Sequence, residues 1–382
     1  MTTATSTESG GAIPPGGRIG ILGGGQLGRM TAMAAARLGY RVHVFTPEGA
    51  GGPCAQVCAA ETVAAYDDLK ALAAFADAVD VVTLEFENVP LATAEFLAAR
   101  RPFFPAPACL AVTQVRTAEK AEVNKLGFAT APWVAVTSLE ELNQALGEVG
   151  RPAVLKTNRF GYDGKGQAKI GLDDDAAAIW ASLKTDDAIL EGFVDFVREI
   201  SVVLTRGQDG AIAAYPAVEN RHRDHILSET IAPADIRPAV AAEAERMAAA
   251  IATDMGYVGV LAVEMFETRD GRLLVNELAP RPHNSGHWTI EGAATSQFEQ
   301  LVRAVCGLPL GSVEYQQSRM INLIGDDALD WQSYLTDPAA HLHLYGKPDV
   351  RPGRKMGHVT WVKHARHSRG RAGYNLSKRR AR

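Results

Sequence analysis

The chain lacks any apolar run of the roughly 18 residues that a membrane-spanning helix needs. It has only four cysteines, and the Cys54–Cys58 pair has no second pair at zinc-binding spacing. We therefore expect reduced thiols in a cytoplasmic protein. A net charge of −5 gives no global indication of a nucleic-acid or membrane partner, and we expect neither.

The two ends of the chain differ in composition from its body. The segment MTTATSTESGGAIPPGG has no basic and apolar regions of a signal peptide, so we expect a disordered leader at 1–17. Residues 365–382 are basic and nearly devoid of apolar residues, which predicts a solvated, disordered tail. Overall, 47% apolar and 22% charged residues are ordinary values for a soluble globular protein of two or three domains.

Strand and helix patterns alternate in the N-terminal part, from Arg18 to about Pro107. RIGIL and YRVHVF predict strands on either side of a helix that ends at Gly39, and DVVTLEF predicts another strand. This alternation favours a parallel sheet.

A first glycine motif lies between the first strand and the first helix of this part. Gly23, Gly25 and Gly28 satisfy G-x-G-x-x-G, and Glu48 follows at about 20 residues, which is typical of dinucleotide binding. A Thr-Pro pair precedes Glu48, so this acid is not cleanly placed at the strand end. Three interpretations stay open: a nicotinamide cofactor of an oxidoreductase, a substrate phosphate at the helix N-terminus, or a structural turn.

Two glutamates in a predicted hairpin are the strongest functional signal. GVLAVEMFET and RLLVNELAP flank Asp270-Gly271, and a two-residue turn there would place Glu264 opposite Glu277. Their Cβ atoms would be about 4.5–5.5 Å apart, and two charged carboxylates that close repel by roughly 3 kcal/mol at an effective dielectric near 20. This repulsion would be avoided in any of four ways: one carboxyl is protonated, a cation lies nearby, the strands pair in another register, or both side chains lie on a solvated face. A divalent metal fits best, because Mg²⁺ is commonly held by one or two carboxylates and by phosphates.

A second glycine loop, FGYDGKGQ at 160–167, could close its backbone over phosphate oxygens. The P-loop spacing is absent. Lys156 ends the strand just upstream and could extend into a cleft, although a hairpin turn with a surface lysine is the alternative. Together with the glutamate hairpin, this loop predicts a site that binds ATP phosphates from both sides.

This combination resembles the ATP-grasp superfamily, and several segments resemble one family in it, the 5-(carboxyamino)imidazole ribonucleotide synthases of purine biosynthesis. The segments are ILGGGQLGRM, TLEFENVP, KTNRFGYDGKGQ, YPAVENRHRDHILSETIAP, NELAPRPHNSGHWTIEGAATSQFEQ and YGKPDVRPGRKMGHV. The resemblance implies an α/β chain with an ATP-grasp fold. Its parts would be a Rossmann-like pre-ATP-grasp domain with a parallel sheet (18–115), the ATP-grasp domain (116–310) and a small β-rich C-terminal domain (311–364).

The activity implied by this resemblance is ATP-dependent carboxylation. ATP, bicarbonate and 5-aminoimidazole ribonucleotide would give the N-carboxylated ribonucleotide, ADP and phosphate through carboxyphosphate, with Mg²⁺ or Mn²⁺ as metal cofactor and a homodimer as the assembly. A formate-dependent ATP-grasp ribonucleotide formyltransferase is the nearest alternative. An oxidoreductase and a non-catalytic nucleotide-binding protein are alternatives of other classes.

The resemblance also implies individual site residues. Those for ATP are Arg116, Lys156, Gly161, Tyr162, Asp163, Gly164, Lys165, Gly166, Gln167, Glu191, Gly192, Phe193, Val194, Glu199, His222, Asn276 and Glu277. The metal ligands would be Glu264 and Glu277, with Ala279 where many superfamily members carry an asparagine ligand. Residues for the ribonucleotide would be Gly25, Gln26, Lys347, Arg354 and Lys355. Catalytic candidates are Asp163, which would orient or deprotonate the amine, Arg281, which would hold bicarbonate, and Lys165 and Lys355.

Overall fold

The computed structural model describes residues 11–161 and 166–363 of the 382-residue chain. The expectations for residues 1–10 of the leader and for the tail at 365–382 lie outside this part, as do those for four loop residues. The four are Tyr162, Asp163, Gly164 and Lys165. Within the described ranges, no helix is both long and apolar enough to cross a membrane.

The N-terminal part forms a parallel sheet, which confirms the prediction from the alternating pattern. Its strands lie in the order β3-β2-β1-β4 and pair in parallel. They are β1 (Arg18–Leu22), β2 (Arg41–Thr46), β3 (Ala60–Val63) and β4 (Val81–Leu84). The helices here are α1 (Gln26–Arg37), η1 (Ala55–Val57), α2 (Leu69–Asp77), α3 (Leu91–Ala98) and α4 (Pro107–Thr113). β1, β2 and β4 are buried along most of their length, as is typical of a parallel sheet that is covered on both faces.

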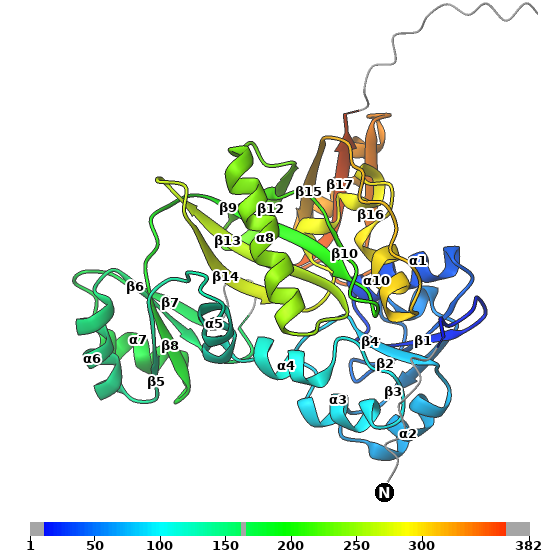
Figure 1. The fold of residues 1–382 in the computed structure, drawn as a ribbon, viewed down its shortest axis with the longest axis horizontal. Helices are drawn as coiled ribbons and strands as arrows, with labels where there is room; N and C mark the ends of the chain where they lie inside the picture. The colour runs from blue at the N-terminus through cyan, green and yellow to red at the C-terminus, as the bar shows by residue number, and fades with distance from the viewer. Residues whose placement is uncertain (1–10, 162–165, 364–382) are drawn as a thin grey trace, which may run out of the picture.

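A small antiparallel sheet projects from one side of the molecule (Figure 1). Its strands lie in the order β5-β8-β6-β7. They are β5 (Trp133–Val136), β6 (Ala153–Thr157), β7 (Gln167–Ile170) and β8 (Ala188–Gly192). The helices α6 (Leu139–Val149) and α7 (Ala176–Leu183) bury their apolar side chains against it. The Ser138 hydroxyl accepts the Glu141 N–H and so starts α6. We call this unit the small lobe.

A large sheet fills the centre and extends to the C-terminal end of the described chain. Its order is β14-β13-β9-β11-β12-β15-β17-β16, with β10 on β9. The central strands are β9 (Phe196–Arg206), β10 (Ile212–Ala214), β11 (Val218–Arg223), β12 (Ile226–Ala232), β13 (Gly259–Thr268) and β14 (Leu273–Ala279). The C-terminal strands are β15 (Ser318–Ile324), β16 (Ala340–Leu344) and β17 (Lys355–Val362). Because β12 pairs with β15, the β-rich C-terminal strands continue the central sheet and form no sheet of their own.

Helices join the N-terminal sheet and the large sheet around a shared core, while the small lobe has a core of its own. α8 (Pro238–Asp254) buries its apolar side chains against β9 and β13. α10 (Gln297–Val305) packs against the same two strands and also against α1. The N-terminal sheet and the large sheet therefore share one core. The remaining helices are α5 (Arg116–Lys125), η2 (Asn284–Gly286), α9 (Thr289–Gly292), η3 (Gly325–Asp330) and α11 (Trp331–Leu335). In Figure 1, α5 lies between the small lobe and the rest of the molecule.

Candidate active site

Glu264 in β13 pairs directly with Glu277 in β14, as predicted, although the hairpin reaches this register by another route. Its turn contains three residues, 269–271, and Gly271 takes the positive φ of 82° that such a turn requires. The longer turn shifts the pairing by one residue, and a bulge at Asn276 shifts it back. The two departures from the predicted hairpin cancel at the glutamate pair.

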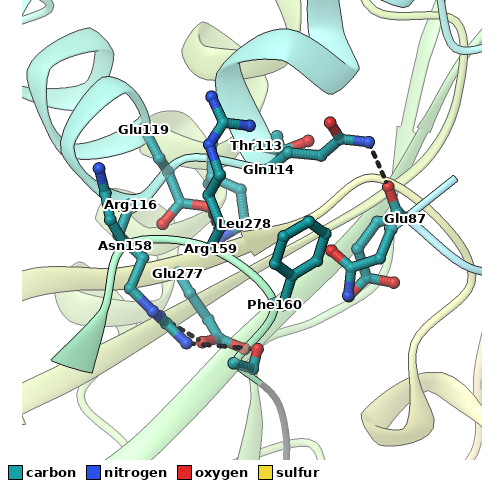
Figure 2. A pocket seen from close by; sticks show the side chains of 12 residues that line it. Glu87, Thr113, Gln114, Arg116, Glu119, Asn158, Arg159, Phe160, Glu277 and Leu278 are labelled. Atoms are coloured by element: carbon teal, nitrogen blue, oxygen red, sulfur yellow. Dashed lines mark hydrogen bonds and ion pairs between the residues drawn. The ribbon is translucent and has the colours of Figure 1, made fainter. Parts of the chain in front are cut away.

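Each facing glutamate has its own basic partner. Glu264 Oε1 lies 2.8 Å from His283 Nε2. Glu277 Oε2 lies 3.4 Å from Arg116 Nη1, as Figure 2 shows. Burial opposes the charge on Glu264, but His283 and the other basic groups around it together outweigh burial and hold the pKa of that carboxyl at about 2. Burial likewise opposes the charge on Arg116, but Glu277 and the neighbouring glutamates together outweigh it, so the pKa of the guanidinium is raised. These partners offset the repulsion that the sequence predicted.

The hairpin supplies oxygen donors that suit a hard divalent cation. Beside Glu277, the buried Oδ1 of Asn276 has no hydrogen-bond partner in the described chain. In the same ranges, no group of three or more His, Cys, Asp or Glu side chains is arranged to hold a metal. Two carboxylates and a neighbouring amide oxygen thus fit Mg²⁺ or Mn²⁺ when phosphate oxygens and water complete the ligand set.

A buried pair of lysines shares one carboxylate at the base of the small lobe. Lys156 ends β6, and its Nζ donates to Glu191 Oε2 at 2.9 Å, while Lys120 Nζ lies 3.3 Å from Glu191 Oε1. The three side chains are 2–11% exposed. Although burial acts to raise the pKa of Glu191, the two ammonium groups lower it. Lys120 also donates to the Asn276 carbonyl at 3.3 Å and so links the small lobe to the glutamate hairpin.

Sequence reasoning missed Lys120 and its neighbour Glu119, because the segment RTAEKAEVNK looks like an exposed polar helix. In the structure both are buried on the face of α5 that also carries Val123. Glu119 Oε2 accepts the Leu278 N–H at 3.0 Å, and burial together with the Glu277 charge raises its pKa to about 8. The three- to four-residue spacing of Arg116, Lys120 and Val123 was the available signal, since it places them on one helix face.

The glutamate hairpin, α5 and the second glycine loop line one pocket (Figure 2). Its lining includes Gln114, Arg116, Glu119, Asn158, Phe160, Gly161 and Glu277. Arg116 Nη2 lies 3.4 Å from the Gly161 carbonyl, so the guanidinium contacts both the metal-side carboxylate and the loop. Phe160 stands 70% exposed at the start of this loop, whereas Gly166 and Gln167 lie at its far end, where β7 begins.

Arg281 is held by Glu87, which follows β4 and lines this pocket. Arg281 Nη2 donates to Glu87 Oε1 at 2.6 Å, and Nε donates to the second carboxylate oxygen. Burial opposes both charges, yet the pairing raises the pKa of Arg281 and lowers that of Glu87. A guanidinium fixed by a two-point pair is oriented before any anion arrives.

The expected adenine and ribose residues follow one another along β8 and β9. Glu191 and Gly192 end β8, and Phe193 beyond them is 48% exposed. Glu199 in β9 accepts from His222 in β11, with Oε2 and Nδ1 3.1 Å apart. Burial alone would lower the pKa of His222, but the Glu199 carboxylate raises it. The structure thus brings these two residues together from adjacent strands.

The first glycine motif is occupied by a carboxylate of the protein itself. Glu85 Oε1 accepts the Gly25 N–H at 2.6 Å, and Oε2 accepts the N–H groups of Leu27 and Gly28, each at 3.1 Å. These are the donors that a dinucleotide pyrophosphate would use. The geometry therefore weighs against the nicotinamide interpretation. Sequence reasoning assigned Glu85 no role.

The cations expected near the ribonucleotide lie on the turn between β16 and β17. Lys347 Nζ donates to the Lys355 carbonyl at 2.7 Å, and Arg354 donates to the Asp349 carbonyl at 3.0 Å. Gln56 of η1 donates to the Gly346 carbonyl at 2.8 Å. The N-terminal part therefore touches the turn that carries Lys347.

Comparison with known proteins places each part of the chain. Family models match it at 17–114 (ribonucleotide synthetase preATP-grasp domain), 121–298 (ATP-grasp domain) and 318–371 (phosphoribosylaminoimidazole carboxylase C-terminal domain). The N5-carboxyaminoimidazole ribonucleotide synthase of Brucella melitensis is 49% identical over 355 residues, which is 92% of this chain and 98% of the relative. The chain belongs to the N5-carboxyaminoimidazole ribonucleotide synthase family. The Bacillus subtilis synthase is 43% identical, and the alignment covers 92% of this chain and 93% of the relative.

Solved structures of this synthase family share the fold. The Aspergillus clavatus N5-carboxyaminoimidazole synthase, in complex with ADP and 5-aminoimidazole ribonucleotide, is 32% identical with a TM-score of 0.85. The alignment covers 91% of this chain and 94% of that one. Membership confirms the resemblance, the ATP-grasp fold and an ATP-dependent ligase activity, and with them the use of ATP.

Proposed function

We propose that this chain carboxylates the amine of 5-aminoimidazole ribonucleotide with bicarbonate, using ATP and releasing ADP and phosphate. The observation that carries the proposal is the pocket in which Arg116 of α5, Glu277 of β14 and Glu87, the partner of Arg281, come together from distant parts of the chain. The Aspergillus clavatus relative, solved with ADP and 5-aminoimidazole ribonucleotide, supports the choice of substrates. We further propose that the enzyme acts as a homodimer in the cytoplasm.

On the ATP side, Arg116 and Lys156 bind the phosphates. Lys156 exchanges its bond to Glu191 for a phosphate oxygen, while Lys120 stays on Glu191 and keeps that buried carboxylate paired. Glu264 and Glu277 would hold Mg²⁺ or Mn²⁺, which would neutralise part of the phosphate charge. A bicarbonate oxygen attacks the γ-phosphorus, ADP leaves, and carboxyphosphate forms.

On the carboxyl side, Arg281 holds bicarbonate and then carboxyphosphate. Its orientation by Glu87 places a fixed positive charge where the anion forms. The aromatic amine attacks the carboxyl carbon, phosphate leaves, and the amine loses one proton. We keep Asp163 and Lys165 as predicted participants in this step.

The ribonucleotide phosphate binds the cations of the β16–β17 turn, which are Lys347, Arg354 and Lys355. The Gly25 N–H already donates to Glu85, so we propose that Gly25 and Gln26 shape the wall of this site while the three cations hold the phosphate.

The test is ADP release by purified protein with Mg²⁺-ATP and 5-aminoimidazole ribonucleotide, with and without bicarbonate. Release that requires both the ribonucleotide and bicarbonate supports the proposal. Release that depends on formate would replace it with the formyltransferase, and no ADP release under any condition would refute it. A Glu264→Gln variant, which removes one carboxylate of the hairpin pair, serves as the negative control for ADP release.

A further inference from the structure

We propose that Cys54 and Cys58 are an oxidisable thiol pair whose disulfide weakens ribonucleotide binding. Their Sγ atoms lie 3.2 Å apart, at the two ends of the short helix η1. A disulfide bond is about 2.05 Å long, so the sulfurs need to approach by only about 1 Å. All four cysteines are free thiols in the structure, and this pair is the one whose geometry allows a disulfide to form on oxidation.

The other two cysteines provide an internal comparison. Cys109 donates to the Met255 carbonyl at 3.4 Å, and Cys306 is buried in the core that α1 shares with α10. Burial raises the pKa of Cys109 to about 11 and that of Cys306 to about 12. The neighbouring Cys58 and burial raise the pKa of Cys54 as well. Cys109 and Cys306 therefore differ from the pair in geometry, because neither has a cysteine partner in the described chain, and they serve as references that cannot form this disulfide.

The two members of the pair have unequal access to solvent. Cys54 is fully buried, whereas Cys58 is half-buried and is the sulfur that a small oxidant meets first. The Cys58 thiolate attacks a hydroperoxide oxygen, which gives a sulfenic acid and, with hydrogen peroxide, one water. The Cys54 sulfur then attacks the Cys58 sulfur, and a second water leaves with the Cys54 proton. In total, two thiols and one hydrogen peroxide give one disulfide and two waters.

Gln56 couples this pair to the substrate side. It lies between the two cysteines in η1, its Nε2 donates to the Gly346 carbonyl at 2.8 Å, and its Oε1 accepts from Arg29 Nη1 at 2.9 Å. The contact leaves little room, since a Cβ on Gly346 would lie 2.3 Å from Gln56 Oε1. Gly346 immediately precedes Lys347, which we propose to bind the ribonucleotide phosphate. Drawing the ends of η1 together displaces Gln56 from this turn. This last step rests on the proposed function.

The experiment treats the full-length protein with hydrogen peroxide and then counts thiols in denaturant, maps cross-linked peptides by mass spectrometry and measures kinetics. We expect two of the four thiols to disappear, a Cys54–Cys58 peptide that is lighter by two hydrogens, and a several-fold higher KM for 5-aminoimidazole ribonucleotide. A dithiol reductant should reverse all three changes. Cys58→Ser should abolish them, and the matched Cys306→Ser variant should retain them.

Retention of all four thiols, or oxidation of Cys58 without a cross-link, would overturn the proposal. A cross-link with an unchanged KM for the ribonucleotide would overturn its link to substrate binding. Reduced protein without activity on the ribonucleotide would instead refute the proposed function, and the mass measurement would still decide the thiol chemistry.

Discussion

Replacing Lys120 with methionine tests whether the shared carboxylate of Glu191 organises the ATP side. Methionine is one atom shorter than lysine; it keeps an unbranched apolar stem but removes the charge 3.3 Å from Glu191 Oε1. Glu191 then depends on Lys156 alone. Because Lys156 is also the proposed phosphate ligand, the variant should lose stability and bind ATP less well.

The magnitude follows from the burial of the pair, whose side chains are 2% and 4% exposed. Removing one partner of a buried ion pair typically costs about 3–5 kcal/mol. Since Lys156 remains on Glu191, we expect the lower end, a decrease of about 3 kcal/mol in the free energy of unfolding. The KM for ATP should rise because Glu191 now retains Lys156 more strongly, whereas the KM for the ribonucleotide should stay unchanged.

Urea unfolding and steady-state kinetics measure both effects. Lys125→Met is the matched control, since Lys125 lies on the same helix with its side chain 61% exposed and should change stability far less. The reasoning is wrong if Lys120→Met unfolds at the same urea concentration as Lys125→Met and keeps the KM for ATP of the unmodified protein.

Three further predictions concern the facing carboxylates and the anion site. The pKa of Glu264 lies at about 2, against 4.5 in the unfolded chain. Ionised Glu264 should therefore stabilise the fold by about 3 kcal/mol above pH 4.5, and this stabilisation should be lost as the pH falls towards 2. The free energy of unfolding of Glu264→Gln should depend less on pH in this range. Glu277→Gln and Lys156→Ala should each lower kcat by about 10²- to 10³-fold, and Glu277→Gln should leave the thermal unfolding midpoint nearly unchanged, whereas Lys156→Ala should lower it because it removes one partner of the buried Glu191 carboxylate; turnover at the unmodified rate with saturating Mg²⁺-ATP would contradict their roles. Arg281→Lys should raise the KM for bicarbonate by about tenfold, because the lysine variant loses one charge-assisted hydrogen bond of about 1.5 kcal/mol. The KM for ATP should change little. An equal rise in the KM for bicarbonate and the KM for ATP would argue against a role of Arg281 in binding bicarbonate.

Local patterns were sufficient to predict the parts of the structure that local chemistry determines. Apolar strands before glycine predicted the N-terminal parallel sheet, and Asp270-Gly271 predicted the hairpin with its facing glutamates. The details of the hairpin were wrong, however. The hairpin has a three-residue turn and a bulge at Asn276, and β14 bonds there to a distant segment, with Val275 N–H donating to the Ala129 carbonyl and Lys120 to the Asn276 carbonyl, which no two-residue motif reports.

Contacts between distant segments could not be predicted in the same way. Lys120 contacts Glu191 and Glu85 contacts Gly25, and each pair is more than 30 residues apart in the sequence. A buried lysine on a polar helix and a glutamate after a strand have ordinary local sequences. Only the fold shows that each has one specific partner, and tertiary burial outweighs local polarity in such cases.

The continuous large sheet has a consequence for synthesis on the ribosome. β12 is complete at Ala232, but the strand that pairs with its open side, β15, begins only at Ser318. During the translation of the intervening residues, β12 presents unpaired N–H and C=O groups, which are a template for strands of other nascent chains. A pause in this interval would therefore favour aggregation, and early chaperone binding would be most useful there.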